Sequence, residues 1–392
     1  MTRGDTRSQN GSPRAAHEPS SGIRRPGARE SRRDYLSASF VGAAGLAIGL
    51  TIVLRVLIPN GMDPTIFIAL GEKAPIQTAY ARRVLGDVQT RPNLGHDGKF
   101  FFAQANDPWY LQPEANAAVL DRPIYRGQRM LFPMIAGGFG LFPPRVVVWS
   151  MLVTNLLALA IGALLAARLA SLWNAPAWLG LAVPLNIGLL YEIVIGGAGI
   201  VAYTCCLGAV YALITDRTSA ASLLFAAAAL SREVMVAFAV GVFILYLYQH
   251  RALWRIVIVP IAAMTIWNAY LRLRLAGVTG LGDGLSIFAA PFVGLWQAFR
   301  SWAADPSLLV VSIAILAVVV TFTILALRSR LPIAWGALPF VALATTLSVH
   351  VWREPFDLSR ALAPVFTAAP FLLVSARDHA VQRAGRGTSE PA

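Results

Sequence analysis

The chain has 392 residues, of which 56% are hydrophobic and only 14% are charged, and its mean hydropathy is +0.60. This composition excludes a pair of soluble domains and is typical of a polytopic membrane protein. Because the apolar runs are about 20 residues long and the bilayer core offers no water to free backbone groups, the spans should be helices. The number of apolar runs of this length therefore predicts an all-α transmembrane bundle of about 10–11 spans.

The net charge of +13 comes almost wholly from arginine, and eight arginines lie in residues 1–34. This segment is rich in Ser, Gly and Pro and has no apolar period, so it cannot bury enough surface to offset its ordering entropy. A basic arm could bind nucleic acid, but a basic tail beside a hydrophobic span more often sets membrane topology. We expect a disordered cytoplasmic tail at 1–34, a transmembrane domain at 35–377, a second disordered cytoplasmic tail at 378–392 and no nucleic-acid partner.

The first span, about residues 36–58, is too long for the apolar region of a signal peptide and is expected to be a retained anchor in the cell membrane. Ten crossings place both termini in the cytoplasm if the short arginine-containing loops lie inside. A long loop, 60–123, then lies outside and is expected to contain short helices. The other apolar runs begin and end at about 145–167, 176–195, 198–215, 219–231, 234–248, 253–271, 308–327, 333–350 and 360–376.

The apolar stretch within the segment 124–142 is short, and Pro133 and three glycines interrupt it. Such a segment suits a re-entrant or interfacial helix. The alternative is an eleventh full span, which would invert the orientation of everything downstream.

Ionisable residues near the spans gather at the predicted outer ends, among them Glu192, the pair Arg232-Glu233 and the run 350–360. A charge at bilayer depth costs on the order of 2.5–3.5 kcal/mol on insertion scales, so these residues should face a polar cavity or pair with one another. The runs 219–231 and 234–248 are too short to cross fully, which places Arg232 and Glu233 at a sheltered depth. The alternative is an ion pair that only neutralises itself in a helical hairpin.

Four motifs carry a family resemblance. The outer loop contains Gly-His-Asp-Gly-Lys-Phe-Phe-Phe-Ala at 95–103, followed by Tyr-Arg-x-Gln-Arg-x-Leu-x-Pro at 125–133, Ala-Ala-Leu-Ser-Arg-Glu at 228–233 and Leu-Ser-Arg-Ala-Leu-Ala-Pro at 358–364. In this order they resemble the GT-C superfamily of polytopic glycosyltransferases over most of residues 36–376. Where some members have a paired acidic motif in the first loop, Asp97 has His96 and Gly98 as neighbours.

The resemblance implies that a sugar moves, with inversion, from a polyprenyl-phosphate donor to an envelope glycan or lipid acceptor outside the membrane, with the loop Asp97 as the catalytic acidic residue. A positioned carboxylate base contributes typically 10²–10⁴ in rate. Guanidinium groups match phosphate oxygens and could stabilise the leaving phosphate, and we nominate Arg232 first, then Arg360, Arg126 and Arg129. For Arg126 and Arg129 the alternative is contact with lipid headgroups.

Supporting roles are open to several neighbours of these residues. Gly98 would let a sugar approach the backbone or is a turn glycine, and His96 would tune Asp97, bind the acceptor or be incidental. Lys99 adds positive charge for a headgroup or a phosphate. Glu192 and Glu233 are further acids, and Asp107 and Asp121 are reserve acids or helix caps. The aromatic residues of this loop would form an interfacial anchor or a stacking surface for sugar and isoprenoid: Phe100, Phe101, Phe102, Trp109 and Tyr110.

The sequence contains no Walker loop, no Rossmann fingerprint and no His/Cys cluster with metal spacing, so a lipid-linked donor is favoured over a nucleotide sugar. The adjacent Cys205 and Cys206 would point about 100° apart on a helix and are expected to be packing residues. No cofactor or metal ligand is predicted, and the use of a divalent cation is left open. The alternative functions are a transporter or flippase, or a non-catalytic binding subunit, for a polyprenyl-linked saccharide.

Overall fold

The computed structural model describes the backbone of residues 32–278 and 288–387. Within these ranges the chain consists of helices and loops, with two isolated β-bridges, Gly71 with Arg91 and Phe288 with Leu347. The all-α prediction is confirmed for these residues. The predicted tails fall largely outside them, at 1–31 and 388–392.

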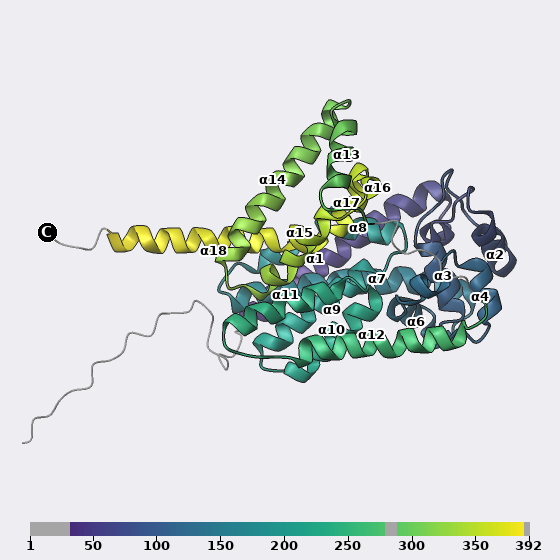
Figure 1. Ribbon diagram of the computed structural model, residues 1–392, viewed down its shortest axis with the longest axis horizontal. Helices are drawn as coiled ribbons and strands as arrows, with labels where there is room; N and C mark the ends of the chain where they lie inside the picture. The colour runs from purple at the N-terminus through teal and green to yellow at the C-terminus, as the bar shows by residue number, and fades with distance from the viewer. Residues whose placement is uncertain (1–31, 279–287, 388–392) are drawn as a thin grey trace, which may run out of the picture.

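The long apolar helices form the frame of the molecule (Figure 1). Four helices of the described ranges have the length and composition to cross a membrane, and a fifth candidate is a pair of helices bent by 68° at one break. This set is compatible with a multi-pass membrane protein. The four are α1 (Arg32–Leu57), α7 (Pro144–Leu172), α12 (Arg255–Arg274) and α14 (Pro306–Arg328), and the bent pair is α17 (Pro355–Ala361) with the first part of α18 (Ala363–Gly387).

Four further apolar helices are shorter than a full span. A helix of 14 residues rises about 21 Å, against a hydrocarbon core of roughly 30 Å. The prediction of ten crossings therefore exceeds the four or five helices or helix pairs of spanning length among the described residues. The shorter helices are α9 (Gly199–Ile214), α10 (Thr218–Ser231), α11 (Met235–Tyr248) and α15 (Pro332–Thr345).

The run 176–195, which the sequence predicted as one span, is divided into η4 (Ala177–Ala182) and α8 (Ile187–Val194). Pro184 lies in the break and has no backbone N–H to continue a helix. The side chain of Asn186 then accepts a hydrogen bond from the Leu189 N–H and caps the start of α8. Glu192 is therefore carried on a short helix of eight residues.

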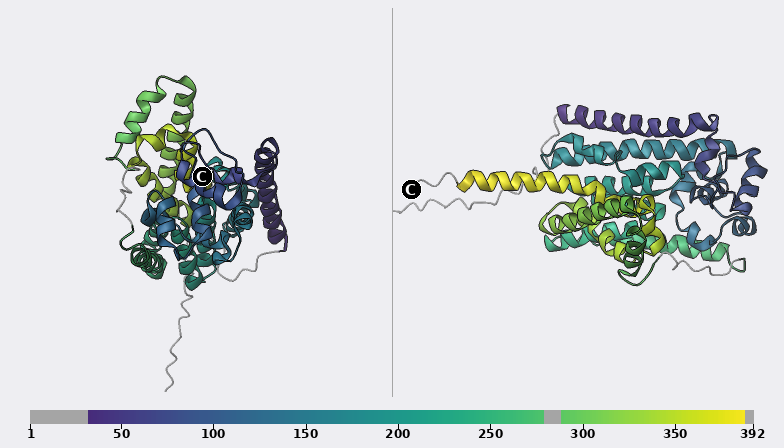
Figure 2. Two further views of the ribbon diagram at one scale, coloured as in Figure 1. Left: turned by 90° about the vertical axis from the view of Figure 1, so that its right-hand side faces the viewer. Right: turned by 90° about the horizontal axis from the view of Figure 1, so that it is seen from above.

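Close packing joins the first two long helices. Figure 2 shows α1 running beside α7 along the length of the molecule. Gly42 and Gly45 allow this approach, because a Cβ at those positions would lie 3.1 Å from Leu164 Cβ and 3.0 Å from Ala163 Cβ. Small residues at such contacts are typical of helices packed in membranes. Farther along the chain, α10 packs between α9 and α12, and α11 packs on α15.

Residues 58–143 form a compact cap of short helices at one end of the bundle, on the right in Figure 1. The beginning of α1 and the end of α18 lie at the opposite end (Figure 2). The segment 124–142 contributes only helices of five, six and three residues, α5, α6 and η3, so it holds no helix of spanning length. The cap consists of η1 (Ile58–Asn60), η2 (Pro64–Ile68), α2 (Pro75–Leu85), α3 (Gly98–Asn106), α4 (Pro113–Val119), α5 (Pro123–Gly127), α6 (Leu131–Ala136) and η3 (Gly138–Gly140).

The remaining short helices follow the segment 279–287. Helix α13 (Val293–Trp302) packs against α16 (Val349–Arg353), and α16 leads into α17. The rings of Trp302 and Trp352 meet edge to face at 6.1 Å, which fixes α13 on α16. This arrangement holds α17 against α8, so two distant parts of the sequence meet beside the cap.

Candidate active site

The backbone around Asp97 is anchored on both sides. The His96 N–H donates to the Ala69 carbonyl at 2.9 Å, and the Gly98 N–H donates to the Ile195 carbonyl at 3.0 Å. Asp97 itself directly precedes α3, and its carbonyl accepts from the N–H groups of Phe100 and Phe101. These bonds link the loop to η2 and to the end of α8. The carboxylate of Asp97 is therefore held on a fixed backbone.

Three guanidinium groups surround the Asp97 carboxylate, whose side chain is 22% exposed. Arg126 Nη1 donates to Oδ1 at 2.8 Å, and Arg360 Nη2 donates to Oδ2 at 3.2 Å. Arg129 Nη1 lies 3.8 Å from Oδ2. Arg126 and Arg129 belong to the cap, whereas Arg360 comes from α17, 263 residues away. The predicted loop carboxylate and three of the four predicted arginines thus converge.

Glu192 is a second centre of charge. Its side chain is 1% exposed, and its Oε1 accepts from Arg360 Nε at 2.9 Å and from Arg232 Nη1 at 3.1 Å. The Gly199 N–H lies 3.2 Å from Oε2. A Cβ at Gly197 would lie 1.6 Å from the same oxygen, so that glycine makes room for the carboxylate. Arg232 therefore pairs with Glu192 and is linked to Asp97 through Glu192 and Arg360. The sequence ranked Arg232 first among the candidate phosphate ligands, and its position now ranks it after the other three arginines.

Three more carboxylates complete the arrangement. Arg129 donates to both oxygens of Glu233, at 2.7 and 2.8 Å. The other two are more exposed: Asp121 takes two bonds from Arg126, at 2.9 and 3.1 Å, and Asp357 takes one from Arg360 at 2.9 Å. We call the whole set the charge cluster: Asp97, Asp121, Arg126, Arg129, Glu192, Arg232, Glu233, Asp357 and Arg360.

The arginines of the charge cluster control the protonation of Asp97. Burial alone would raise the pKa of Asp97, but the charges of Arg126, Arg360 and Arg129 outweigh it and hold that pKa far below its ordinary range. Asp97 is therefore ionised at every physiological pH. A carboxylate with such a low pKa is a weak base as long as all three guanidinium groups remain on it.

His96 lies beside the cluster, and a hydrogen bond of 2.7 Å joins its Nε2 to the Tyr191 hydroxyl. Burial disfavours the charged imidazole and Arg360 repels it, so the pKa of His96 lies below its ordinary value of 6.5. A pKa lower in the folded than in the unfolded state gives stability that is present above pH 6.5 and is lost as the pH falls through the folded value. Asp357 and Asp97 oppose this shift only in part.

We therefore expect the thermal unfolding midpoint to fall as the pH is lowered from 7 to 5, and the His96→Gln variant to show a shallower fall. Asp97 does not titrate in this window, because its pKa lies far below it. Differential scanning fluorimetry of both proteins across this pH series measures the effect. An identical slope in the variant would contradict the assignment.

Three of the predicted supporting residues, Lys99, Asp107 and Gly98, have structural roles instead. Lys99 is only 7% exposed, and its ammonium donates to the Leu94 carbonyl, so it does not present charge to a headgroup or a phosphate. Asp107 accepts from the N–H groups of Leu111 and Gln112, at 2.9 and 2.8 Å, and from Asn116. It holds the turn before α4 and is not part of the charge cluster.

Gly98 fills a tight backbone contact. A Cβ there would lie 2.5 Å from the Ile195 carbonyl oxygen and 2.7 Å from that of Ile68. Gly98 therefore lies against protein backbone. The sequence had suggested instead that it makes room for a sugar or forms a turn. Gly98 positions the neighbouring Asp97 against α8.

Most of the loop aromatics are core residues. Phe100, Phe101, Phe102 and Tyr110 are buried, and only Trp109 is substantially exposed. The predicted interfacial anchor or stacking surface is wrong for these four. Phe100 still contributes to the site, because the Arg126 guanidinium lies 4.1 Å from its ring centroid. Cys205 and Cys206 are unpaired, and Cys206 is buried, in agreement with packing.

Two residues of the site, Tyr191 and Asp357, were not singled out from the sequence. Asp357 had a local signal, because it lies three residues before Arg360 on one helix, where opposite charges pair. Tyr191 had none, since only the folding of the cap onto α8 brings it to His96. Among the described residues, no three His, Cys, Asp or Glu side chains are grouped so that they could hold a metal ion.

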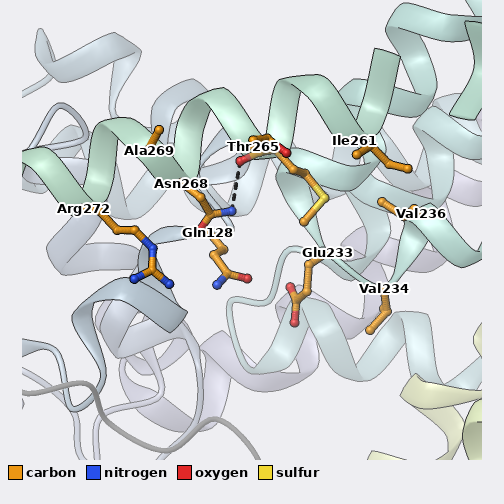
Figure 3. Close-up of a pocket in the computed structure, with 10 residues that line it drawn as sticks. Gln128, Glu233, Val234, Val236, Ile261, Thr265, Asn268, Ala269 and Arg272 are labelled. Carbon is orange, nitrogen blue, oxygen red and sulfur yellow. Dashed lines mark hydrogen bonds between the residues drawn. The ribbon is translucent and has the colours of Figure 1, made fainter. Parts of the chain in front are cut away.

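Two grooves lie beside the cluster. One has a volume of about 620 Å³ and is mainly apolar, with walls from η4, α14, α17 and α18 that include Phe356 and Ser359 next to Arg360. The other has a volume of about 680 Å³ and runs along α12, with Glu233 on its wall (Figure 3). We call them the α17 groove and the α12 groove. Glu233 of the charge cluster thus lines the α12 groove, and Arg360 of the cluster follows Ser359 of the α17 groove in the sequence.

Comparison with known proteins gives no relative: no family model, no curated protein and no solved structure matches the chain.

Proposed function

We propose that the protein is an integral membrane glycosyltransferase that moves a sugar from a polyprenyl-phosphate donor to an envelope acceptor, with inversion at the anomeric carbon. The observation that carries the proposal is the contact of a loop carboxylate, Asp97, with three guanidinium groups from two distant parts of the chain. A base and phosphate ligands within one site are what this transfer requires. The motifs that resemble the GT-C superfamily supply the residues of that contact.

In the proposed reaction, Asp97 takes the proton from an acceptor hydroxyl while the acceptor oxygen attacks the anomeric carbon. The bond between that carbon and the donor phosphate oxygen breaks, and the phosphate leaves with the electron pair. Arg126 and Arg360 stabilise the charge that develops on it, since each offers a planar fork beside the base. The proton ends on Asp97, and the charge balance is maintained.

The same arginines link donor binding to base strength. In the free protein they hold the pKa of Asp97 far below its ordinary range. A phosphate that draws Arg126 or Arg360 toward itself removes part of that stabilisation, so the pKa of Asp97 rises. The base therefore becomes effective only when the donor is present, which protects the lipid-linked sugar from loss to water.

A lipid-linked donor also fits the α17 groove. The groove is mainly apolar, and its lining residues Phe356 and Ser359 lie in α17 together with the phosphate ligand Arg360. The ring of Phe356 also packs against that of Tyr191, with 5.1 Å between the ring centroids, so the apolar wall continues to the edge of the cluster. An isoprenoid chain in the groove would place its phosphate near Arg360.

The proposal is tested with the full-length protein reconstituted in liposomes, supplied with a radiolabelled polyprenyl-phosphate sugar and an extract of envelope lipids and glycans. We expect labelled product together with consumption of the donor. Movement of intact donor across the bilayer without product would instead indicate a flippase. Binding of the donor with neither product nor movement would indicate a non-catalytic subunit, and both results contradict the proposal.

The two more exposed carboxylates of the charge cluster should compete with the donor phosphate. Asp121 and Asp357 occupy the forks of Arg126 and Arg360 at 2.9 Å. Exposed ion pairs contribute about 0.2–1 kcal/mol, so Asp121→Asn and Asp357→Asn should each lower the KM for the donor by up to about fivefold, with little change in kcat. Initial rates against donor concentration measure this. A raised KM in both variants would contradict the competition, and Asp305→Asn, on the solvent-exposed cap of α14, is the control.

A further inference from the structure

The walls of the α12 groove change from apolar to polar along one direction (Figure 3). On α12 the lining residues run from Ile261 and Met264 to Asn268 and Arg272. These 11 residue steps correspond to about 16 Å along the helix. On the opposite wall, Val236 lies at the apolar end and Glu233 toward the polar end. A ligand that fits this groove has an apolar chain and a polar head.

The apolar end of the groove lies beside exposed aliphatic side chains of α12. Only 22% of the most apolar 18-residue stretch of α12 is buried, and the side chains of Ile258, Ile261 and Ile266 are exposed. In a membrane-spanning helix, exposed aliphatic side chains of this kind face lipid. A lipid could therefore enter the groove sideways, without passing through water.

The polar end carries a cation without an ionic partner. Each arginine of the charge cluster has a carboxylate within 4 Å, whereas Arg272 forms no ion pair with any side chain that the structure describes. A guanidinium at the membrane surface binds a phosphate with two parallel hydrogen bonds. Gln128 and Glu233, which lie across the groove from it (Figure 3), offer an amide and a carboxylate suited to hydroxyl groups.

This polar end adjoins the proposed base. Glu233 lines the groove and takes two hydrogen bonds from Arg129, whose Nη1 lies 3.8 Å from the Asp97 carboxylate. A hydroxyl group near Glu233 is thus one side chain away from Asp97. The α17 groove adjoins the cluster through Arg360, on another element. Two elongated ligands could therefore reach the same carboxylate from separate grooves.

We propose that the α12 groove binds the acceptor, and that the acceptor is a membrane phospholipid with a hydroxylated headgroup. Its chain lies against Ile261, Met264 and Val236, its phosphate contacts Arg272, and a headgroup hydroxyl reaches toward Glu233 and Asp97. This inference rests on the proposed function, because it names the class of acceptor for that transfer.

Binding is tested with the full-length protein in phosphatidylcholine nanodiscs that contain a trace of phosphatidylinositol with a photoreactive acyl chain. We expect crosslinks on α12 near Ile261 and Met264, at least fivefold weaker in Arg272→Gln. Arg55→Gln, which removes an exposed arginine at the cap end of α1, should leave them unchanged. Equal labelling by a photoreactive phosphatidylcholine, or equal labelling of Arg272→Gln, would overturn the inference.

Transfer is tested with a matched pair of alanines on α12. Ala269 lines the groove, whereas Ala262 is exposed outside it. Ala269→Leu should slow transfer to phosphatidylinositol at least tenfold without changing donor binding, and Ala262→Leu should not. Transfer to a water-soluble glycan that Ala269→Leu does not slow would overturn the acceptor inference and leave the proposed function standing. Arg272-dependent labelling without transfer to any acceptor would overturn both.

Discussion

Replacement of Asp97 by Asn should lower kcat for sugar transfer by two to four orders of magnitude, the usual contribution of a positioned general base. This is a rise in the activation barrier of about 2.7–5.5 kcal/mol. The amide cannot accept the proton from the acceptor hydroxyl, and its single oxygen can replace only one of the two carboxylate oxygens that accept from Arg126 and Arg360. The KM for the donor should change much less, because the phosphate ligands remain.

The control for charge is Asp121→Asn, which also removes one negative charge next to Arg126 but lies at the exposed edge of the cluster. It should retain near wild-type kcat. Asp97→Glu keeps a carboxylate at a displaced position and should recover part of the lost rate. Thermal unfolding of each variant in detergent verifies folding. Wild-type turnover by a folded Asp97→Asn protein would remove Asp97 from the mechanism, whatever the fate of the other residues.

Replacement of Arg360 by Gln should produce a larger loss of stability than replacement of any other arginine of the charge cluster. This residue donates to three carboxylates, Asp97, Glu192 and Asp357. Arg360→Gln leaves Glu192, which is almost fully buried, with Arg232 as its one cationic partner among the described residues. Breaking a buried ion pair in this way costs about 3–5 kcal/mol, so the unfolding midpoint should fall by several degrees and transfer should be lost.

The double variant Glu192→Gln/Arg360→Gln separates the ionic contact from general damage. If the two side chains stabilise one another, the double variant should be less destabilised than the sum of the single variants, by about 0.5–3 kcal/mol. Arg353→Gln is the matched control, since Arg353 is exposed and, among the residues that the structure describes, donates only to Ser301, at 3.1 Å. It should stay within about 0.5 kcal/mol of the wild type. Additive losses in the double variant would contradict a direct contact between Arg360 and Glu192.

Several parts of the structure could be read from the sequence because their causes are local. The helices that begin at Arg32, Pro144, Arg255 and Pro306 lie close to the apolar runs, since hydropathy over about 20 residues decides whether a segment suits the bilayer. The sequence also singled out Arg232 and Arg360, because charges beside membrane spans are costly. It singled out Asp97, Arg126 and Arg129 because of the loop motifs in which they lie.

The tertiary structure alone decided which of these charges pair. Arg360 and Asp97 are 263 residues apart, and no local pattern reports a contact of that range. The same applies to the loop phenylalanines: their spacing fits a surface helix as well as a buried one, and only the packing of α3 within the cap and against α7 made them core residues. The break of the run 176–195 depended on Pro184 and the capping by Asn186, which hydropathy does not register. Local sequence thus determined which segments are apolar enough to cross a membrane and where the charged residues lie beside them, whereas long-range packing determined the partners of those charges, because electrostatic pairing depends on distance in space and not on separation along the chain.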